Sequence, residues 1–247
     1  MRDLNDYEQK YSEQPYEGFQ AYFRKRKIME ILSAHKHDVL LEVGCGLDSI
    51  FNHMDGYRKL YVIEPGNTFY QQAVKDREKA SCKNDITILH KTLEEGVVEL
   101  SKVTFDFILL SGLLHEVPNP AQILNAVYQL CSPQTVVHIN VPNARSFHRM
   151  LAVEMGLIKS EFERSDSNIE FQQFSVFSMD TLSQLVDASG FRVTETGSYS
   201  FKPFTHRQME DMIKSGLITQ DMLEGLYKME KYLPGLGSEI FLNAVKK

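Results

Sequence analysis

The chain has 247 residues, a length that suits one α/β domain with embellishments or one domain plus a small cap. Hydrophobic residues make up 43% and charged residues 24% of the sequence, and the formal net charge is −6. This balance argues against broad contact with nucleic-acid backbones, although it leaves room for a local basic pocket. No apolar run approaches the roughly 20 residues of a membrane span. The three cysteines lie far apart, as expected of free thiols in a reducing compartment, and we therefore expect a cytoplasmic protein.

The first 37 residues are predicted to form an N-terminal helical flap. Residues 19–32 place apolar side chains at helical spacing, with a basic face at residues 24–27. Three tyrosines precede this helix and are candidates for a segment that closes on a bound ligand, although such aromatics more often serve packing: Tyr7, Tyr11 and Tyr16. Residues 38–247 are expected to form the main domain.

Short apolar runs alternate with helical segments between residues 38 and 142. The runs end in glycine, proline or polar residues, as buried parallel strands do, and lie at residues 38–43, 60–63, 86–89, 105–110 and 135–141. Helices are predicted at residues 68–79 and 120–130. This alternation predicts an α/β fold with a doubly wound parallel sheet.

Beyond residue 142 the alternation is interrupted twice. Two longer, mostly helical insertions at about residues 143–177 and 201–237 flank a helix at residues 178–189 and a strand at residues 191–199. A last strand is predicted at residues 238–245. We expect the insertions to form a lid over the carboxyl edge of the sheet, where open α/β sheets bind ligands.

A glycine turn follows the first predicted strand. Glycine at Gly44 and Gly46 lets the backbone approach a ligand closely, but the same turn serves two nucleotide cofactor classes or no ligand at all. Glu64 ends the next strand, 20 residues after Gly44, where a carboxylate can accept hydrogen bonds from both ribose hydroxyls. A solvated strand end is the plainer alternative for Glu64.

The residues around this turn favour S-adenosylmethionine over NAD. A dinucleotide fingerprint wants a third glycine at position 49, which is Ser49. A carboxylate at Glu42 would repel a pyrophosphate, whereas it suits a cofactor with an amino group and a sulfonium charge. A nicotinamide-dependent oxidoreductase is therefore the less favoured alternative.

Four stretches resemble motifs of the class I S-adenosylmethionine-dependent methyltransferases: residues 39–50, Glu64–Pro65, residues 105–118 and residues 177–193. The resemblance is best over residues 38–143. It implies a Rossmann-like, seven-stranded, mostly parallel sheet with a final antiparallel strand beside the sixth. The strands predicted at residues 191–199 and 238–245 fit that role.

The resemblance also implies residue roles at the cofactor. The methionine part of the cofactor would meet Glu42, Gly44, Gly46, Ser111 and Leu113, and the nucleoside would meet Glu64, Pro65, Thr92 and Leu93. Asp48 stands where the family often has a third glycine, and its carboxylate could contact the cofactor amino group or cap the next helix.

The reacting end needs alignment of the acceptor with the methyl group and, for a hydroxyl acceptor, a base. His115 follows the fourth strand, where related small-molecule methyltransferases often place a histidine that faces the acceptor; a structural role is the alternative. Glu116 could orient His115 or face solvent.

The start of the first insertion supplies a second candidate cluster. Arg145, His148 and Arg149 lie on neighbouring faces of a predicted helix, where they could bind an anionic acceptor or supply a base, or could form a solvated face. Tyr199 is a further candidate contact of the acceptor. This stretch resembles the lid region of O-methyltransferases from quinone and surface-polysaccharide pathways.

No metal is expected, because the eight histidines are scattered and no carboxylate cluster accompanies them. The sequence thus predicts a cytoplasmic, monomeric or homodimeric enzyme that methylates an oxygen of a small molecule, anionic or sugar-linked, by base-assisted in-line displacement. N-methylation and a non-catalytic cofactor-binding role are the alternatives.

Overall fold

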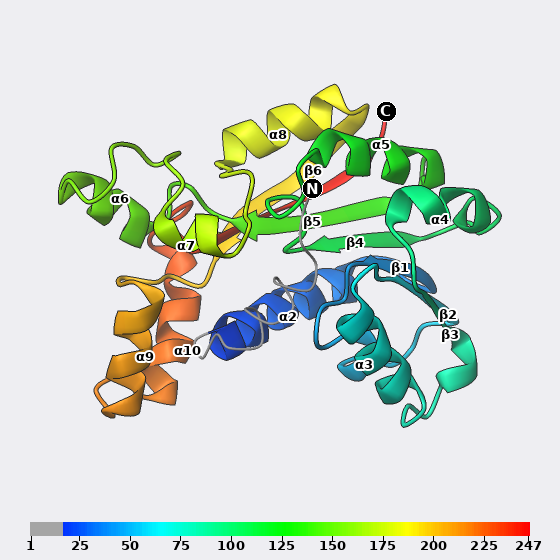
Figure 1. Cartoon of the computed structure of the whole chain (residues 1–247), viewed down its shortest axis with the longest axis horizontal. Helices are drawn as coiled ribbons and strands as arrows, with labels where there is room; N and C mark the ends of the chain where they lie inside the picture. The colour runs from blue at the N-terminus through cyan, green and yellow to red at the C-terminus, as the bar shows by residue number, and fades with distance from the viewer. Residues whose placement is uncertain (1–16) are drawn as a thin grey trace.

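The computed structural model describes residues 17–247, so Tyr7, Tyr11 and Tyr16 lie outside the described part of the chain. Within it, one sheet has the strand order β3-β2-β1-β4-β5-β7-β6 (Figure 1). Its seven strands are β1 (Val39–Val43), β2 (Lys59–Ile63), β3 (Ile86–Leu89), β4 (Phe107–Ser111), β5 (Val136–Pro142), β6 (Phe191–Tyr199) and β7 (Glu239–Lys246). Strand β7 runs antiparallel to β5 and β6, and the other neighbours are parallel. The prediction of a doubly wound, seven-stranded, mostly parallel sheet is confirmed.

Helices cover both faces of the sheet. One face carries α4 (Leu93–Leu100), α5 (Pro120–Leu130) and α8 (Met179–Ala188), and the other carries α2 (Glu17–Ala34) and α3 (Asn67–Arg77) (Figure 1). The two insertions add α6 (Phe147–Glu154), α7 (Asp166–Glu170), α9 (His206–Lys214) and α10 (Gln220–Tyr227). Single turns of 3-10 helix lie at Ile50–Asn52, Lys83–Asp85 and Lys228–Lys231.

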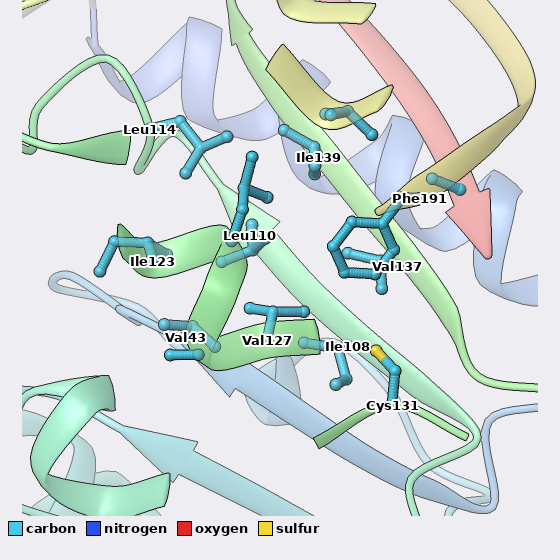
Figure 2. Close-up of a cluster of buried hydrophobic side chains, with 14 of the residues drawn as sticks. Val43, Ile108, Leu110, Leu114, Ile123, Val127, Cys131, Val137, Ile139 and Phe191 are labelled. Carbon is cyan, nitrogen blue, oxygen red and sulfur yellow. The ribbon is translucent and has the colours of Figure 1, made fainter. Parts of the chain in front are cut away.

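The first apolar core lies between the sheet and α5. Figure 2 shows Ile108 and Leu110 of β4 and Val137 of β5 facing Val127 on α5. All five residues of β1 are buried, as expected of a central parallel strand that is covered on both faces. This rigid centre fixes the strand ends from which the loops at the carboxyl edge emerge.

The second core lies under α2. Phe23, Ile28 and Leu32 of this helix are buried against the opposite face of the sheet. The Phe23 ring stacks on Tyr227 of α10, with 5.0 Å between ring centroids. The helical part of the predicted N-terminal flap is therefore packed as a layer of the fold.

Helix α4 was not predicted, although a local signal for it exists. Thr92 is its N-cap: the hydroxyl accepts from the Glu95 amide at 3.4 Å, and the Glu95 carboxylate accepts from the Thr92 amide at 3.0 Å. This reciprocal pair is a capping box, which the sequence spells as threonine followed three residues later by glutamate.

The two insertions meet beside the end of β5. Asn143 donates from its amide side chain to the carbonyls of Gly235 (2.9 Å) and Gly237 (2.8 Å). The rings of Phe147 on α6 and Phe201 lie 5.0 Å apart. Segments nearly 100 residues apart in the sequence thus meet at this end of the sheet, with α6 and α7 above α9 and α10 in the view of Figure 1.

Candidate functional site

A cavity of about 1410 Å³ follows the carboxyl edge of the sheet. Its walls come from α2, the loops after β1, β2, β4 and β5, and the first helices of both insertions. The predicted site residues that line it are Glu42, Gly44, Gly46, Asp48, Glu64, Pro65, Ser111, Leu113, His115, Glu116, His148 and Arg149. Thr92, Leu93, Arg145 and Tyr199 are not among the lining residues.

The glycine turn has the backbone geometry that only glycine adopts readily. Gly44 has a φ of +74° and Gly46 a φ of +57°. A Cβ atom at Gly46 would meet nothing within 4 Å, so the positive φ, rather than crowding by the protein, accounts for this glycine. The turn consequently leaves open space on the cavity side.

Glu64 shapes this turn. One carboxylate oxygen accepts from the amides of Cys45 (2.9 Å) and Gly46 (3.3 Å), and the other accepts from the amide of Gly66 at 2.8 Å. Burial raises the pKa of Glu64 despite these donors. The Cys45 thiol is a further donor to this carboxylate, which thus ties the loop after β2 to the glycine turn.

Glu42 is buried behind the turn, and its carboxyl group is a weaker acid than usual because of this burial. Its carboxylate accepts from the Ser49 hydroxyl and from the Ile50 amide at 3.1 Å. Burial raises the pKa of Glu42 to about 7, against the lowering effect of these donors and of Lys25. Ser49, which replaces the third glycine of a dinucleotide site, therefore has a role as a donor to Glu42.

Asp48 lies between α2 and the far end of the next helical turn. Its carboxylate pairs with Lys25 and with His53 (2.7 Å), and it accepts from the Asn52 amide at 2.8 Å. The helical turn that follows has Ser49 as its N-cap, so the capping alternative for Asp48 is wrong. The charge that seemed out of place in the turn is neutralised by a lysine from α2.

The loop after β4 is held by Asn140 of β5. Its side-chain oxygen accepts from the Gly112 amide at 3.0 Å and from the Ser111 hydroxyl at 3.3 Å. Gly112 has a φ of +64°, and this bend turns Ser111 and Leu113 toward the cavity. Asn140 is fully buried and was not predicted, because its partners lie 28 and 29 residues earlier in the chain.

His115 and Glu116 line the cavity on the loop after β4. His115 is 5% exposed, and its Nε2 atom lies 3.7 Å from a Glu116 carboxylate oxygen. The His115 carbonyl accepts from the amides of Phe174 (2.8 Å) and Ser175 (3.1 Å) in the first insertion. The backbone at His115 is thereby fixed to the first insertion.

Three predicted residues at the start of the first insertion have different surroundings. His148 lines the cavity, and burial, with nearby positive charge, lowers its pKa well below the ordinary value. The Arg149 guanidinium donates to the carbonyls of Glu161 (2.9 Å) and Glu163 (2.6 Å), so it binds the insertion's own backbone. Arg145 is exposed and pairs with Asp180 at 2.8 Å, outside the cavity.

Tyr199 is a correction to the predicted acceptor contacts. It is 2% exposed, packs in the second core and donates its hydroxyl to Glu239, which is fully buried. Arg24 donates to both oxygens of the same carboxylate from its Nε atom (3.0 Å each), and Gln20 donates at 2.8 Å. Burial would raise the pKa of Glu239, but Arg24 and the donated hydrogen bonds hold it below its ordinary value.

Thr92 and Leu93 also lie away from the cavity lining. Thr92 caps α4, and Leu93 is buried in the first core. Pro65 does line the cavity, directly after Glu64. The wall near the predicted nucleoside end is thus provided by the loop after β2.

Two negative findings concern the described part of the chain. In residues 17–247, no group of three or more histidine, cysteine, aspartate or glutamate side chains is arranged to hold a metal ion. Over the same residues, no helix combines the length and apolar character needed to cross a membrane.

Comparison with known proteins identifies the family of this chain. A model of the methyltransferase domain matches residues 16–196, which is most of the chain. The chain belongs to the methyltransferase-domain family. No match was found among curated proteins.

Solved structures with the same fold include three with different descriptions. A protein from Thermotoga maritima, an S-adenosylmethionine-dependent methyltransferase described as a possible histamine N-methyltransferase, is 14% identical, with a TM-score of 0.62 over 99% of each chain. The plantazolicin methyltransferase BamL, solved with S-adenosylhomocysteine (SAH), is 14% identical, with a TM-score of 0.58 over 97% of this chain and 88% of BamL. The cyclase SpnF is 14% identical, with a TM-score of 0.60 over 92% of this chain and 81% of SpnF.

These likenesses establish the fold of S-adenosylmethionine-dependent methyltransferases for this chain. The fold by itself does not decide the reaction, since one of the three structures is a cyclase. The reaction depends on the residues that line the cavity.

Proposed function

We propose that this methyltransferase-family protein transfers a methyl group from S-adenosylmethionine to an oxygen atom of a small anionic molecule. The observation that carries the proposal is the single cavity that joins the glycine turn to the lid. Pockets for one small ligand measure about 300–1,000 Å³. The cavity, at about 1410 Å³, accommodates a nucleoside cofactor together with an acceptor.

The glycine turn and its two carboxylates fit the cofactor. Glu64 lines the cavity at the end of β2, where its carboxylate can accept from a ribose hydroxyl in exchange for one of its present donors. Glu42 places negative charge behind Gly44 and Gly46, which suits the cationic amino group and sulfonium of the cofactor. When bound, S-adenosylmethionine supplies an electrophilic methyl group. Asp48 is not part of this proposal because Lys25 and His53 occupy its carboxylate.

His115 is the proposed base. It lies two residues beyond Leu113 on the loop that flanks the methionine end, and Glu116 lies close enough to orient its ring. His148 suits this role less, because its depressed pKa makes it a weaker base. A base on the protein favours an oxygen acceptor, because a hydroxyl group must lose its proton during methyl transfer. An amine can lose its proton before it binds and needs such a base less.

Calorimetric titration tests the cofactor half of the proposal. S-adenosylmethionine and SAH should both bind, whereas reduced NAD should show no change in fluorescence on mixing. If neither S-adenosyl compound binds, the proposal is refuted.

A panel of hydroxylated sugars and phenols with and without carboxylate or phosphate groups tests the acceptor half. We expect mass spectrometry to show a gain of one methyl group on anionic members, and NMR to place it on oxygen. His115→Ala should lower kcat by about 10²–10⁴-fold. His37→Ala is the control and should leave kcat unchanged, because His37 does not line the cavity. A methyl group found on nitrogen would establish the N-methylation alternative, and cofactor binding without any turnover would favour a non-catalytic role.

A further inference from the structure

A cluster of basic side chains lies at the lid end of the cavity. Lys202 follows β6 and is 2% exposed, although a lysine is among the residues least often buried completely. Its Nζ atom lies 3.0 Å from Nδ1 of His206, the first residue of α9. Both residues line the cavity, as does His148 of α6.

The hydrogen bonds in this cluster have one consistent direction. The Lys202 ammonium has only donors, so Nδ1 of His206 accepts and the proton of the neutral ring is on Nε2. Nε2 then donates to the Gln20 side-chain oxygen at 2.6 Å, and the Gln20 amide donates to Glu239 at 2.8 Å. Lys202 and His206 are thereby held in place by residues of α2 and β7.

The electrostatic surroundings of the cluster are positive. Apart from burial, the groups that lower the pKa of His148 are Lys202, His206 and Arg149, and those that lower the pKa of His206 are Lys202 and Arg24. In addition, Nδ1 of His148 is buried and has no hydrogen-bond partner within residues 17–247. The Nδ1 atom of His148 can therefore donate to a ligand oxygen when it carries the ring proton.

The cluster is separate from the cofactor end of the cavity. The glycine turn and Ser111 follow β1 and β4, whereas Lys202 follows β6 and His148 opens the insertion after β5. In the sheet order, β5, β7 and β6 form one half and β3, β2 and β1 the other, with β4 between them. A group bound by the cluster would therefore belong to the acceptor.

We propose that Lys202 and His148 form a subsite for an anionic oxygen group, a carboxylate or a phosphate, of the methyl acceptor, and that His206 holds the Lys202 ammonium in position. This inference rests on the proposed methyltransferase function and assigns to this cluster the role predicted for Arg145, Arg149 and Tyr199. The Lys202 ammonium and the Nδ1 atom of His148, when it carries the ring proton, are donors that suit such oxygens, and both residues line the cavity.

Titration calorimetry of the full chain with inorganic phosphate and, separately, with acetate tests this subsite. Saturable binding of either ion is expected, and the tighter of the two identifies the acceptor's group. Lys202→Met should weaken that binding by about tenfold or more, as expected for loss of one charge-assisted contact. Lys214→Met is the matched control: it also lines the cavity, but its side chain is 67% exposed, and its effect should stay within about twofold.

His148→Gln is the second variant, in case Lys202→Met does not fold. It retains a hydrogen-bonding side chain on α6, and it should weaken anion binding by about threefold or more. The affinity for SAH, measured on the same samples, should be unchanged in every variant. The subsite is refuted if wild type binds neither ion, or if Lys202→Met and His148→Gln bind as wild type does. Failure of SAH to bind would instead refute the proposed function, so the two failures are distinguishable.

Discussion

The two ends of the cavity are built in opposite ways. At the cofactor end, the carboxylates of Glu42 and Glu64 accept from backbone amides of residues at most 19 positions away. At the lid end, Lys202 and His206 are held by side chains, and the contact between His206 and Gln20 spans 186 positions. The first end is acidic and local in sequence, and the second is basic and assembled from distant segments.

This difference indicates how each end responds to substitution. A carboxylate held by backbone amides controls the shape of one turn, so its loss should affect cofactor affinity. A cluster held by side chains depends on the relative position of α2, β7 and the second insertion, so its loss should affect stability as well as binding.

Glu239→Gln should have the largest effect, because Glu239 joins α2 to β7 beneath the lid end. Removing its charge takes the Glu239 carboxylate away from the Arg24 guanidinium, which is 14% exposed. Breaking a buried pair in this way costs about 3–5 kcal/mol of unfolding free energy. Because the pKa of Glu239 is held below its ordinary value, this contribution is present near neutral pH and is lost as the pH falls through the folded-state pKa.

Urea unfolding at pH 7 measures this loss. Glu224→Gln is the control, since its pair with Arg26 is partly exposed on both sides and should contribute less than about 1 kcal/mol. Equal losses in the two variants would show that the α2–β7 contact does not differ from a surface ion pair.

Glu64→Gln should have the next largest effect, now at the cofactor end. The amide can no longer accept from Cys45, Gly46 and Gly66 together, and its NH2 group opposes an amide donor. We expect a loss of about 2–3 kcal/mol in SAH binding, roughly a 30- to 150-fold rise in Kd.

Titration calorimetry with SAH and with phosphate shows whether the two ends are independent. Phosphate affinity should be unchanged in Glu64→Gln, and exposed Glu99→Gln should leave both affinities unchanged. A parallel loss of phosphate binding would mean that the two ends are coupled.

The pH dependence of cofactor binding gives a smaller effect with a defined sign. The pKa of Glu42 is raised by burial to about 7, so its negative charge is lost as the pH falls below that value. If only the ionised form attracts the cationic cofactor, affinity for S-adenosylmethionine should be about tenfold weaker at pH 6 than at pH 8. Glu42→Gln should remove this dependence, and the same slope in the variant would assign it to another group.

Arg145→Ala should have the smallest effect. Arg145 is exposed, pairs with Asp180 and does not line the cavity. We expect phosphate and SAH affinities within about twofold of wild type and a stability change within about 0.5 kcal/mol. A strong loss of anion binding in this variant would return Arg145 to the acceptor site.

Most of the sheet could be predicted because its signals are local. The run at residues 39–43 is apolar and ends in glycine, and β6 and α5 have the same bounds as predicted. Residue patterns of this kind depend on burial of one segment at a time. The unpredicted helix α4 had an equally local signal in Thr92 and Glu95.

The site could be predicted only in part, for a related reason. Glu42, Gly44, Gly46 and Glu64 are near in sequence and reach the cavity together. Two of the predicted acceptor contacts have protein partners instead. Tyr199 donates to the buried Glu239 carboxylate, and Arg149 donates to backbone carbonyls of the first insertion. Which way a polar side chain points depends on the partners that the fold supplies.

The sequence by itself determined the α/β class, the strands and the glycine turn with its acids, since each follows from the spacing of residues within one segment. Only the tertiary structure decided the role of Asp48, the anchoring of α2 through Glu239 and the basic cluster around Lys202. Charged and polar groups lose too much solvation to be buried without partners, and those partners come from α2, β7 and the second insertion. The chain order does not reveal that these segments meet at one end of the cavity.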